Sequence, residues 1–238
     1  KKLQKLGVNA AIIKTQDIRF YTIEAKDRNA EGELITNLFK LLRNDYEVCV
    51  ISAEALMKKY TPSSEIKDLV LDIRTDSTLD MDDLTSHLIK LGYVREHKVE
   101  GLGMFAIRGA IVDIFSPGQE YPFRIELFGD QVDSIRSFDI YTQKSLEKFQ
   151  EVEIFPSKAF ILPEGERLSK AVQSLEKDCN EQTGEDILYD IERIKEGQYF
   201  EGIEKYINYF YENSTLYDYI QKDNLIVLND PGRLLERM

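Results

Sequence analysis

Short apolar runs alternate with helical patterns over residues 8 to 60 of the chain. The run VNAAII comes first, followed by a helical stretch, then by the run VCVIS and a second helical stretch, AEALMKKY. The first helical stretch has its apolar residues at the spacing of one helix face, at Leu34, Ile35, Leu38, Phe39 and Leu42. This strand, helix, strand, helix order predicts a parallel sheet of the α/β type.

The pattern changes after one more apolar strand, LVLDI. The next segment, STLDMDDLTSHLIKLGY, predicts a helix with Asp80 as its N-cap and Gly92 as its C-terminal stop. From Tyr93 to about Phe155, short alternating segments are separated by turns such as Gly129–Asp130. These segments predict an antiparallel meander with one helix packed against it.

The last part of the chain returns to helical spacing over residues 164 to 196, and the run NLIVLND near the end predicts one more buried strand. The fold class that follows is α/β, with a parallel-sheet domain interrupted by a small α+β domain that contains an antiparallel sheet. We place the interrupted domain at residues 1–72 and 158–238, and the inserted domain at residues 73–157.

The segment YPFRIELFGD, residues 121–130, has a phenylalanine where alternation expects a polar side chain. If Phe123 and every second residue after it are buried, then Arg124, Glu126 and Phe128 share the outer face. Arg108 stands at the end of a nearby predicted strand. Arginine beside an exposed aromatic residue is typical of a protein-docking hot spot. The alternative is that a helix or loop of the same chain covers Phe128.

Composition narrows the possible partners and the compartment. The 238 residues carry a formal net charge of −12, which repels nucleic acid and anionic lipid. The only cysteines are Cys49, which we expect to be a buried thiol, and Cys179; two cysteines fit a reducing cytosol. No apolar run approaches the roughly 20 residues of a membrane span, so we expect a cytoplasmic protein without membrane contact. The chain begins and ends without obvious boundaries, which suggests a fragment of something longer.

A nucleotide site is not expected in this chain. We find no glycine-rich loop that ends in Gly-Lys-Ser/Thr. Asn229 and Asp230 follow the last apolar run, and Asn229 would be a neutral substitute for the carboxylate that supports Mg²⁺. We therefore predict no catalytic residue and no cofactor here, and no enzymatic activity of this chain alone.

Metal and nucleic-acid sites are also disfavoured. The carboxylates between Asp76 and Asp83 lack the spacing of a calcium loop and are better explained as helix capping. His87 and His97 have no cysteine or histidine near them in the sequence at the spacing that metal ligands require. The tyrosine-rich residues 199–219 could stack bases, but acidic neighbours favour a packing role.

Residues 105–157 carry the ordered motifs IRG-x3-DIF, R-I-E-x-F and D-x2-TQ-x-S. This segment resembles the module shared by the excision-repair protein UvrB and the transcription-repair coupling factor Mfd. The resemblance extends through EGIEKY and TLYDYI to NLIVLND, and back to VCVISAEAL, so it covers most of the chain. The spacing FDIYTQKSLE and the missing phosphate loop are more similar to Mfd than to UvrB.

The resemblance implies a degenerate RecA-like domain, of the P-loop NTPase type, split by a small domain that docks on UvrA. The docking residues of the family, two arginines and a phenylalanine, fall on Arg108, Arg124 and Phe128, and Glu126 is expected to orient Arg124.

The implied function is recruitment of UvrA to stalled transcription for nucleotide excision repair. In a whole Mfd-like protein, RNA polymerase and double-stranded DNA bind other domains, and ATP with Mg²⁺ drives a DNA translocase there. The alternative is a fragment of a UvrB-type excinuclease subunit whose ATP site is completed outside this chain.

Overall fold

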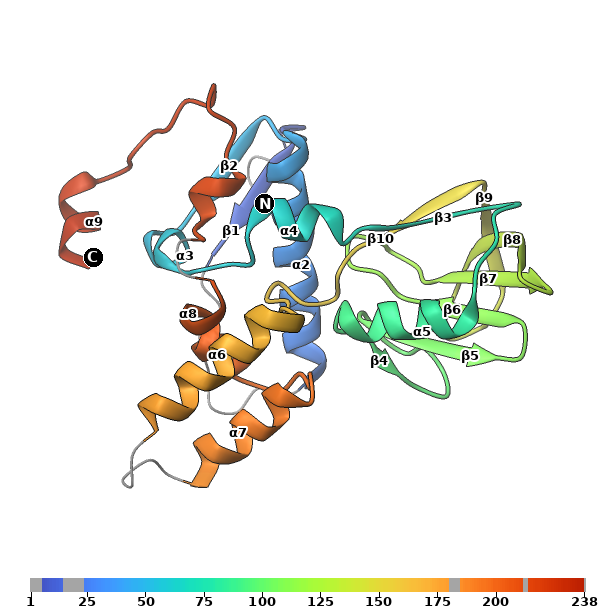
Figure 1. Ribbon diagram of the computed structural model, residues 1–238. Helices are drawn as coiled ribbons and strands as arrows, with labels where there is room; N and C mark the ends of the chain where they lie inside the picture. The colour runs from blue at the N-terminus through green and yellow to red at the C-terminus, as the bar shows by residue number, and fades with distance from the viewer. Residues whose placement is uncertain (1–5, 15–23, 180–184, 212–213, 238) are drawn as a thin grey trace.

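The computed structural model describes residues 6–14, 24–179, 185–211 and 214–237. Figure 1 shows two lobes: helices and a short parallel sheet on one side, and a larger antiparallel sheet with one helix on the other. Strands β3 and β10 run between the two lobes. The mixed α/β class predicted from the sequence is confirmed.

The first lobe contains the predicted parallel pair. Strand β1 (Ala10–Ile13) pairs in parallel with β2 (Val48–Ile51), and helix α2 (Glu24–Arg43) connects them across the sheet. The apolar stripe predicted for this helix is its buried face, where Ile35 and Leu38 pack against Ile13 and Ile66. The short helices α3 (Ala53–Met57) and α4 (Ser63–Asp68) follow β2.

The second lobe is built on the predicted meander. Six strands lie in the order β4-β5-β6-β7-β8-β9, and every neighbouring pair is antiparallel except β4 with β5. A separate antiparallel pair joins β3 to β10. The bounds are β3 (Leu71–Arg74), β4 (Val94–Arg95), β5 (Met104–Arg108), β6 (Ile111–Ile114), β7 (Phe123–Phe128), β8 (Gln131–Phe138), β9 (Ser145–Phe149) and β10 (Glu151–Ile154).

Helix α5 (Met81–Lys90) covers the inner face of this sheet and begins and ends as the sequence predicts. The Asp80 carboxylate accepts hydrogen bonds from the amides of Asp82 and Asp83, which confirms its role as N-cap. The chain leaves the helix at Gly92, whose φ of +82° favours glycine. A Cβ at Gly92 would also lie 2.3 Å from Cγ of Lys158, so a side chain there would collide.

The rest of the first lobe is helical, and its tyrosines pack in the interior. The bounds are α6 (Gly165–Asp178), α7 (Glu185–Lys195), η1 (Ile203–Tyr206), α8 (Ile207–Phe210), η2 (Leu216–Tyr219) and α9 (Pro231–Arg237). The hydroxyl of buried Tyr211 donates to the Ile161 carbonyl at 2.9 Å, and that of Tyr206 donates to Asp190 at 2.8 Å. The packing role predicted for the tyrosine-rich segment is confirmed at these positions.

The buried strand predicted in NLIVLND is wrong. Residues 225–228 form no strand, and Leu225 is 90% exposed. The side chain of Asn224 donates to the Tyr46 hydroxyl at 2.6 Å, and beyond this contact the chain runs out in an exposed loop to α9, which lies beside α3 (red in Figure 1). An apolar run is buried only where another part of the protein offers a surface that covers it, and the sequence pattern does not show whether such a surface is present. Cys49 is likewise half-buried rather than buried: it packs against the core together with Ile51, while Val48 and Val50 occupy the exposed face of β2.

The junction between the lobes is held by paired groups. Arg43 at the end of α2 donates two hydrogen bonds to the carboxylate of Glu153 on β10, at 2.7 and 2.6 Å. The rings of Phe39 and Phe155 stack with centroids 4.3 Å apart, and the Tyr93 hydroxyl donates to the Phe155 carbonyl. These contacts fix how the antiparallel sheet is presented.

Candidate protein-docking site

The outer face of β7 is arranged as alternation predicts. Phe123, Ile125 and Leu127 are buried in the core beneath the sheet. Arg124 and Glu126 point to the opposite face and are only partly exposed, whereas Phe128 at the end of the strand is 82% exposed. The alternative that another part of the chain covers Phe128 is therefore excluded for the described residues.

A tight turn presents Phe128. Phe128 pairs with Gln131 across a two-residue connection, and Gly129 in that connection has a φ of +62°. A positive φ at the first position of such a turn strongly favours glycine and matches the twist of the two strands. The hairpin thus fixes the backbone under Phe128 while its ring stays in solvent.

Arg124 is held in place within the sheet. Its Nε and Nη2 donate to the two carboxylate oxygens of Asp113 at 2.7 and 2.8 Å, and Nη2 also donates to Gln143 at 2.9 Å. The guanidinium lies 4.1 Å from the centre of the Phe138 ring. Hydrogen bonding to Asp113 raises the pKa of Arg124. Its side chain is only 14% exposed, so Arg124 shapes the surface more than it offers free donors.

Arg108 shares the same carboxylate but remains more accessible. Its Nη2 donates to Asp113 at 2.5 Å, and close to half of its side chain is exposed. The Gly109 turn between β5 and β6 places Arg108 at the tip of its strand. Arg108 is therefore the arginine of this face best placed to reach a partner's carboxylate.

Glu126 pairs with a different arginine. It forms an ion pair with Arg136 on β8 and accepts a hydrogen bond from the Ser134 hydroxyl at 3.2 Å. Arg124 is oriented by the hydrogen bonds that it donates to Asp113 and Gln143, and Glu126 acts on Arg124 only as a nearby negative charge.

Sequence reasoning missed Asp113, whose side chain is 2% exposed. The signal was present, because an aspartate in the middle of the apolar strand AIVDIF requires a positive partner when it is buried. What the sequence does not give is the register, which places Asp113 directly opposite Arg124.

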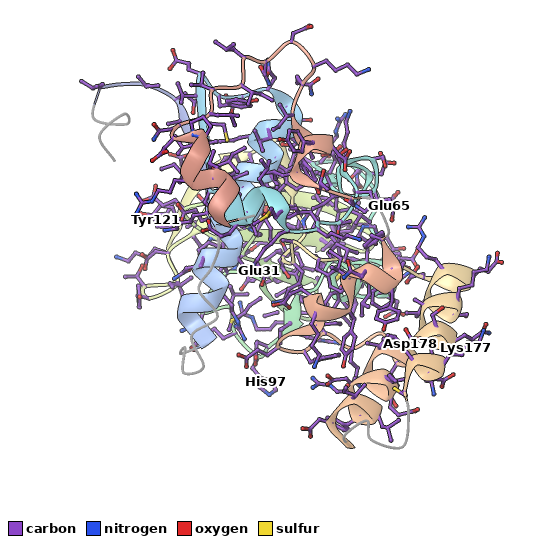
Figure 2. The ribbon with its side chains drawn as sticks, turned by 90° about the vertical axis from the view of Figure 1, so that its left-hand side faces the viewer. Glu31, Glu65, His97, Tyr121, Lys177 and Asp178 are labelled. Carbon is purple, nitrogen blue, oxygen red and sulfur yellow. The ribbon has the colours of Figure 1, made fainter. Side chains whose placement is uncertain are left out.

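Other titratable clusters do not compete with this face. No group of three or more His, Cys, Asp or Glu side chains suited to a metal ion occurs among the described residues. Figure 2 shows His97 at the lower edge of the molecule, where it is exposed. His87, in the last turn of α5, is half-buried, and this burial lowers its pKa. In the described part of the chain, no helix is long and apolar enough to span a membrane.

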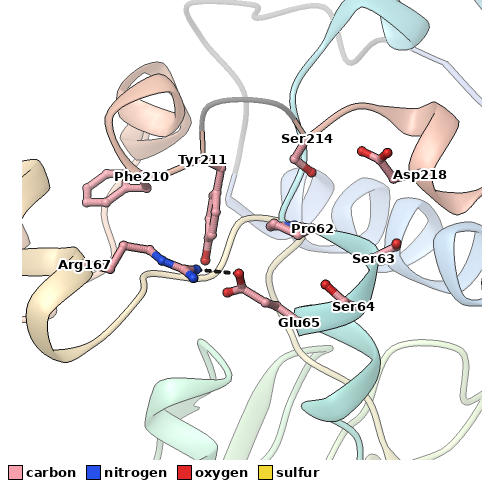
Figure 3. A pocket seen from close by; sticks show the side chains of 9 residues that line it. All are labelled: Pro62, Ser63, Ser64, Glu65, Arg167, Phe210, Tyr211, Ser214 and Asp218. Carbon is pink, nitrogen blue, oxygen red and sulfur yellow. Dashed lines mark hydrogen bonds and ion pairs between the residues drawn. The ribbon is translucent and has the colours of Figure 1, made fainter.

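A cleft of about 470 Å³ lies in the first lobe, between α4, α6 and the segment from α8 to η2. Figure 3 shows Arg167 facing Glu65 across it, and these side chains form an ion pair. The guanidinium of Arg167 also lies 5.6 Å from the ring of Tyr211, and Asp218 on the far side accepts a hydrogen bond from the Thr215 amide. These charged side chains already pair with groups of the same chain. We therefore interpret the cleft as a gap where helices pack against each other, and not as a binding site.

Comparison with known proteins places the candidate face within a known domain. Residues 71–160 match the family model described as the UvrB interaction domain. This range contains all four candidate residues, Arg108, Arg124, Glu126 and Phe128.

Curated relatives extend the similarity over most of the chain. The transcription-repair-coupling factor of Bacillus subtilis (strain 168) is 33% identical over 208 residues, which are 82% of this chain and 18% of that protein. The transcription-repair-coupling factor of Staphylococcus aureus (strain MRSA252) is 30% identical over 232 residues, 93% of this chain and 20% of that protein. The chain thus spans about a fifth of the length of these relatives. Residues 71–160 thus match the UvrB interaction domain, and over most of its length the chain is similar to part of the transcription-repair-coupling factors.

Proposed function

We propose that this chain recruits UvrA to stalled transcription, as the UvrA-binding part of a transcription-repair coupling factor. The observation that carries the proposal is the exposed ring of Phe128 on the same sheet face as Arg108, within the range that matches the UvrB interaction domain. A large apolar ring held in solvent by a rigid hairpin loses little conformational entropy when a partner buries it.

The three basic and aromatic residues have separate tasks in this proposal. Phe128 enters an apolar pocket of UvrA, and Arg108 forms a charge-assisted hydrogen bond to a UvrA carboxylate. Arg124 keeps the sheet surface in shape through Asp113, and Glu126 does the same through Arg136. Affinity therefore depends most on Phe128 and Arg108.

The first lobe has no chemical task of its own in this proposal. We infer that it is a degenerate RecA-like domain without nucleotide hydrolysis, so the chain needs no cofactor and is not an enzyme alone. The segment with Asn229 and Asp230 supports this inference, because it lies exposed instead of forming a strand beside β2. The names of the curated relatives favour a coupling factor over a UvrB-type subunit.

The remaining activities belong to the full-length protein. Because the chain spans about a fifth of its relatives, there is room elsewhere for an ATP- and Mg²⁺-dependent DNA translocase and for a segment that binds RNA polymerase. Double-stranded DNA would also bind there, since the net charge of −12 disfavours it here. The proposed setting is the cytoplasm.

Titration calorimetry with purified UvrA tests the proposal. Phe128→Ala and Arg108→Glu should each weaken binding by at least about 30-fold, because hot-spot residues contribute 2 kcal/mol or more. Tyr189→Ala on α7 is the matched control, since this tyrosine is exposed on the other lobe. Phe128 and Tyr189 are exposed, so circular dichroism should show unchanged folds for their variants; Arg108 pairs with buried Asp113, so the fold of Arg108→Glu is checked in the same way before its affinity is interpreted. Wild-type affinity in both test variants would reject the proposal.

A further inference from the structure

A second apolar group lies at the other end of the outer face. Tyr141 is 86% exposed in the connection between β8 and β9, and Leu146 on β9 is 48% exposed. Ser145, next to Leu146, pairs with Phe138, and the ring of Phe138 contacts the guanidinium of Arg124, so Leu146 lies at the end of β9 that is nearest the connection carrying Tyr141. We call Tyr141 and Leu146 the second anchor.

The connection that carries Tyr141 is well ordered by hydrogen bonds. The Asp139 carboxylate accepts from the amides of Tyr141 and Thr142 at 3.1 and 2.7 Å, and from the Thr142 hydroxyl at 2.8 Å. These bonds, led by the Thr142 amide, lower the pKa of Asp139. Gln143 has a φ of +60°; its side-chain amide donates to the Ile140 carbonyl, and its backbone amide donates to the Asp139 carbonyl. Tyr141 is thus displayed on a preorganised backbone.

The second anchor is tied to the residues already described. The side-chain oxygen of Gln143 accepts the hydrogen bond from Arg124 Nη2, so one guanidinium links Asp113 in the sheet to the connection that carries Tyr141. Phe128 is four residues from Arg124 along β7, a distance of about 13 Å at the usual rise per residue. A standard interface of about 800 Å² per partner is roughly 30 Å across, enough to cover both ends.

We propose that UvrA contacts this face at both ends, binding Phe128 at one end and the second anchor at the other. This inference rests on the proposed function and adds to it the extent of the bound surface. The ion pairs of Arg124 and Arg136 in the middle are formed within the chain, so they give the surface its shape and add little affinity. The complementary surface on the partner has two apolar pockets separated by a polar strip.

Single and combined substitutions test the two-ended arrangement, with UvrA binding measured by titration calorimetry. Tyr141→Ala should weaken binding about tenfold, and Leu146→Ala should weaken it less, because its side chain is smaller and less exposed. Gln143→Ala removes the link to Arg124 and should weaken binding through a looser connection, seen as faster amide hydrogen exchange at Tyr141 and Thr142. Tyr189→Ala is again the control on the other lobe.

The outcomes separate this inference from the proposed function. Weakened binding by both Tyr141→Ala and Phe128→Ala supports the two-ended surface. Unchanged binding by Tyr141→Ala together with weakened binding by Phe128→Ala overturns the second anchor and leaves the proposed function standing. Unchanged binding by both variants overturns the proposed function itself. Binding that depends on Tyr141 but not on Phe128 also overturns the two-ended arrangement.

Discussion

Arg124 donates two hydrogen bonds across neighbouring strands to Asp113, and the carboxylate of Asp113 is almost completely buried. Arg108 donates to the same carboxylate, so one buried negative charge organises both arginines of the candidate docking face. Removing one partner of a buried pair costs far more than exchanging the whole pair for apolar groups, because the other partner loses its compensation.

Asp113→Asn should therefore lower the free energy of unfolding by about 3 kcal/mol, at the lower end of the usual range because both arginines keep some contact with water. Urea unfolding followed by circular dichroism measures this change. Asp133→Asn, which removes an exposed carboxylate from β8, is the control and should stay within about 0.5 kcal/mol of wild type. A loss below about 1 kcal/mol in Asp113→Asn would contradict the organising role.

Arg124→Lys tests whether geometry or charge matters at this position. Lysine keeps the charge, but its single ammonium group cannot replace the planar guanidinium. It cannot at the same time bond both oxygens of Asp113, stack on Phe138 and reach Gln143. We expect unfolding to become easier by about 2 kcal/mol. The amides of Tyr141 and Thr142 should also exchange hydrogen faster.

Arg108→Lys is the matched control for that experiment, because Arg108 makes one hydrogen bond to Asp113 and does not contact Gln143. It should leave the exchange of the Tyr141 and Thr142 amides unchanged. Equal exchange in both variants would show that Arg124 does not position the connection between β8 and β9.

The pair that joins the lobes should make stability depend on pH. Hydrogen bonding from Arg43 lowers the pKa of Glu153 from its ordinary value of 4.5. A carboxyl group whose pKa is lower in the folded state stabilises that state above its ordinary pKa, and this stabilisation is lost as the pH falls through the lower, folded value. Both side chains are nearly half exposed, so the contribution should stay below about 1 kcal/mol.

Unfolding of wild type and of Glu153→Gln, measured between pH 7 and pH 3, should show this effect. The advantage of wild type should be greatest at neutral pH and should vanish at the acidic end. Glu147→Gln on β9 controls for the loss of one negative charge. A constant difference between wild type and Glu153→Gln across this range would show that ionisation of Glu153 does not contribute.

Local patterns predicted much of the fold because they reflect local physics. The cap at Asp80, the stop at Gly92 and the alternation in β7 all depend on neighbours within a few residues. The link from Asp113 to Arg124 depends instead on the register between two strands, which one sequence does not state. Tyr141 was not singled out either, because it lies in a connection outside any alternating pattern.

The exposed run at Leu225–Leu228 gives a final prediction. The combined change Leu225→Ser and Val227→Ser should leave the free energy of unfolding within about 0.5 kcal/mol of wild type, because these side chains are in solvent. It should also reduce self-association, measured by analytical ultracentrifugation, since contiguous exposed apolar surface favours aggregation. Leu216→Ser is the buried control and should cost about 3 kcal/mol or more. A loss above about 1 kcal/mol in the double variant would mean that this run packs against the lobe in solution, as its apolar pattern first indicated.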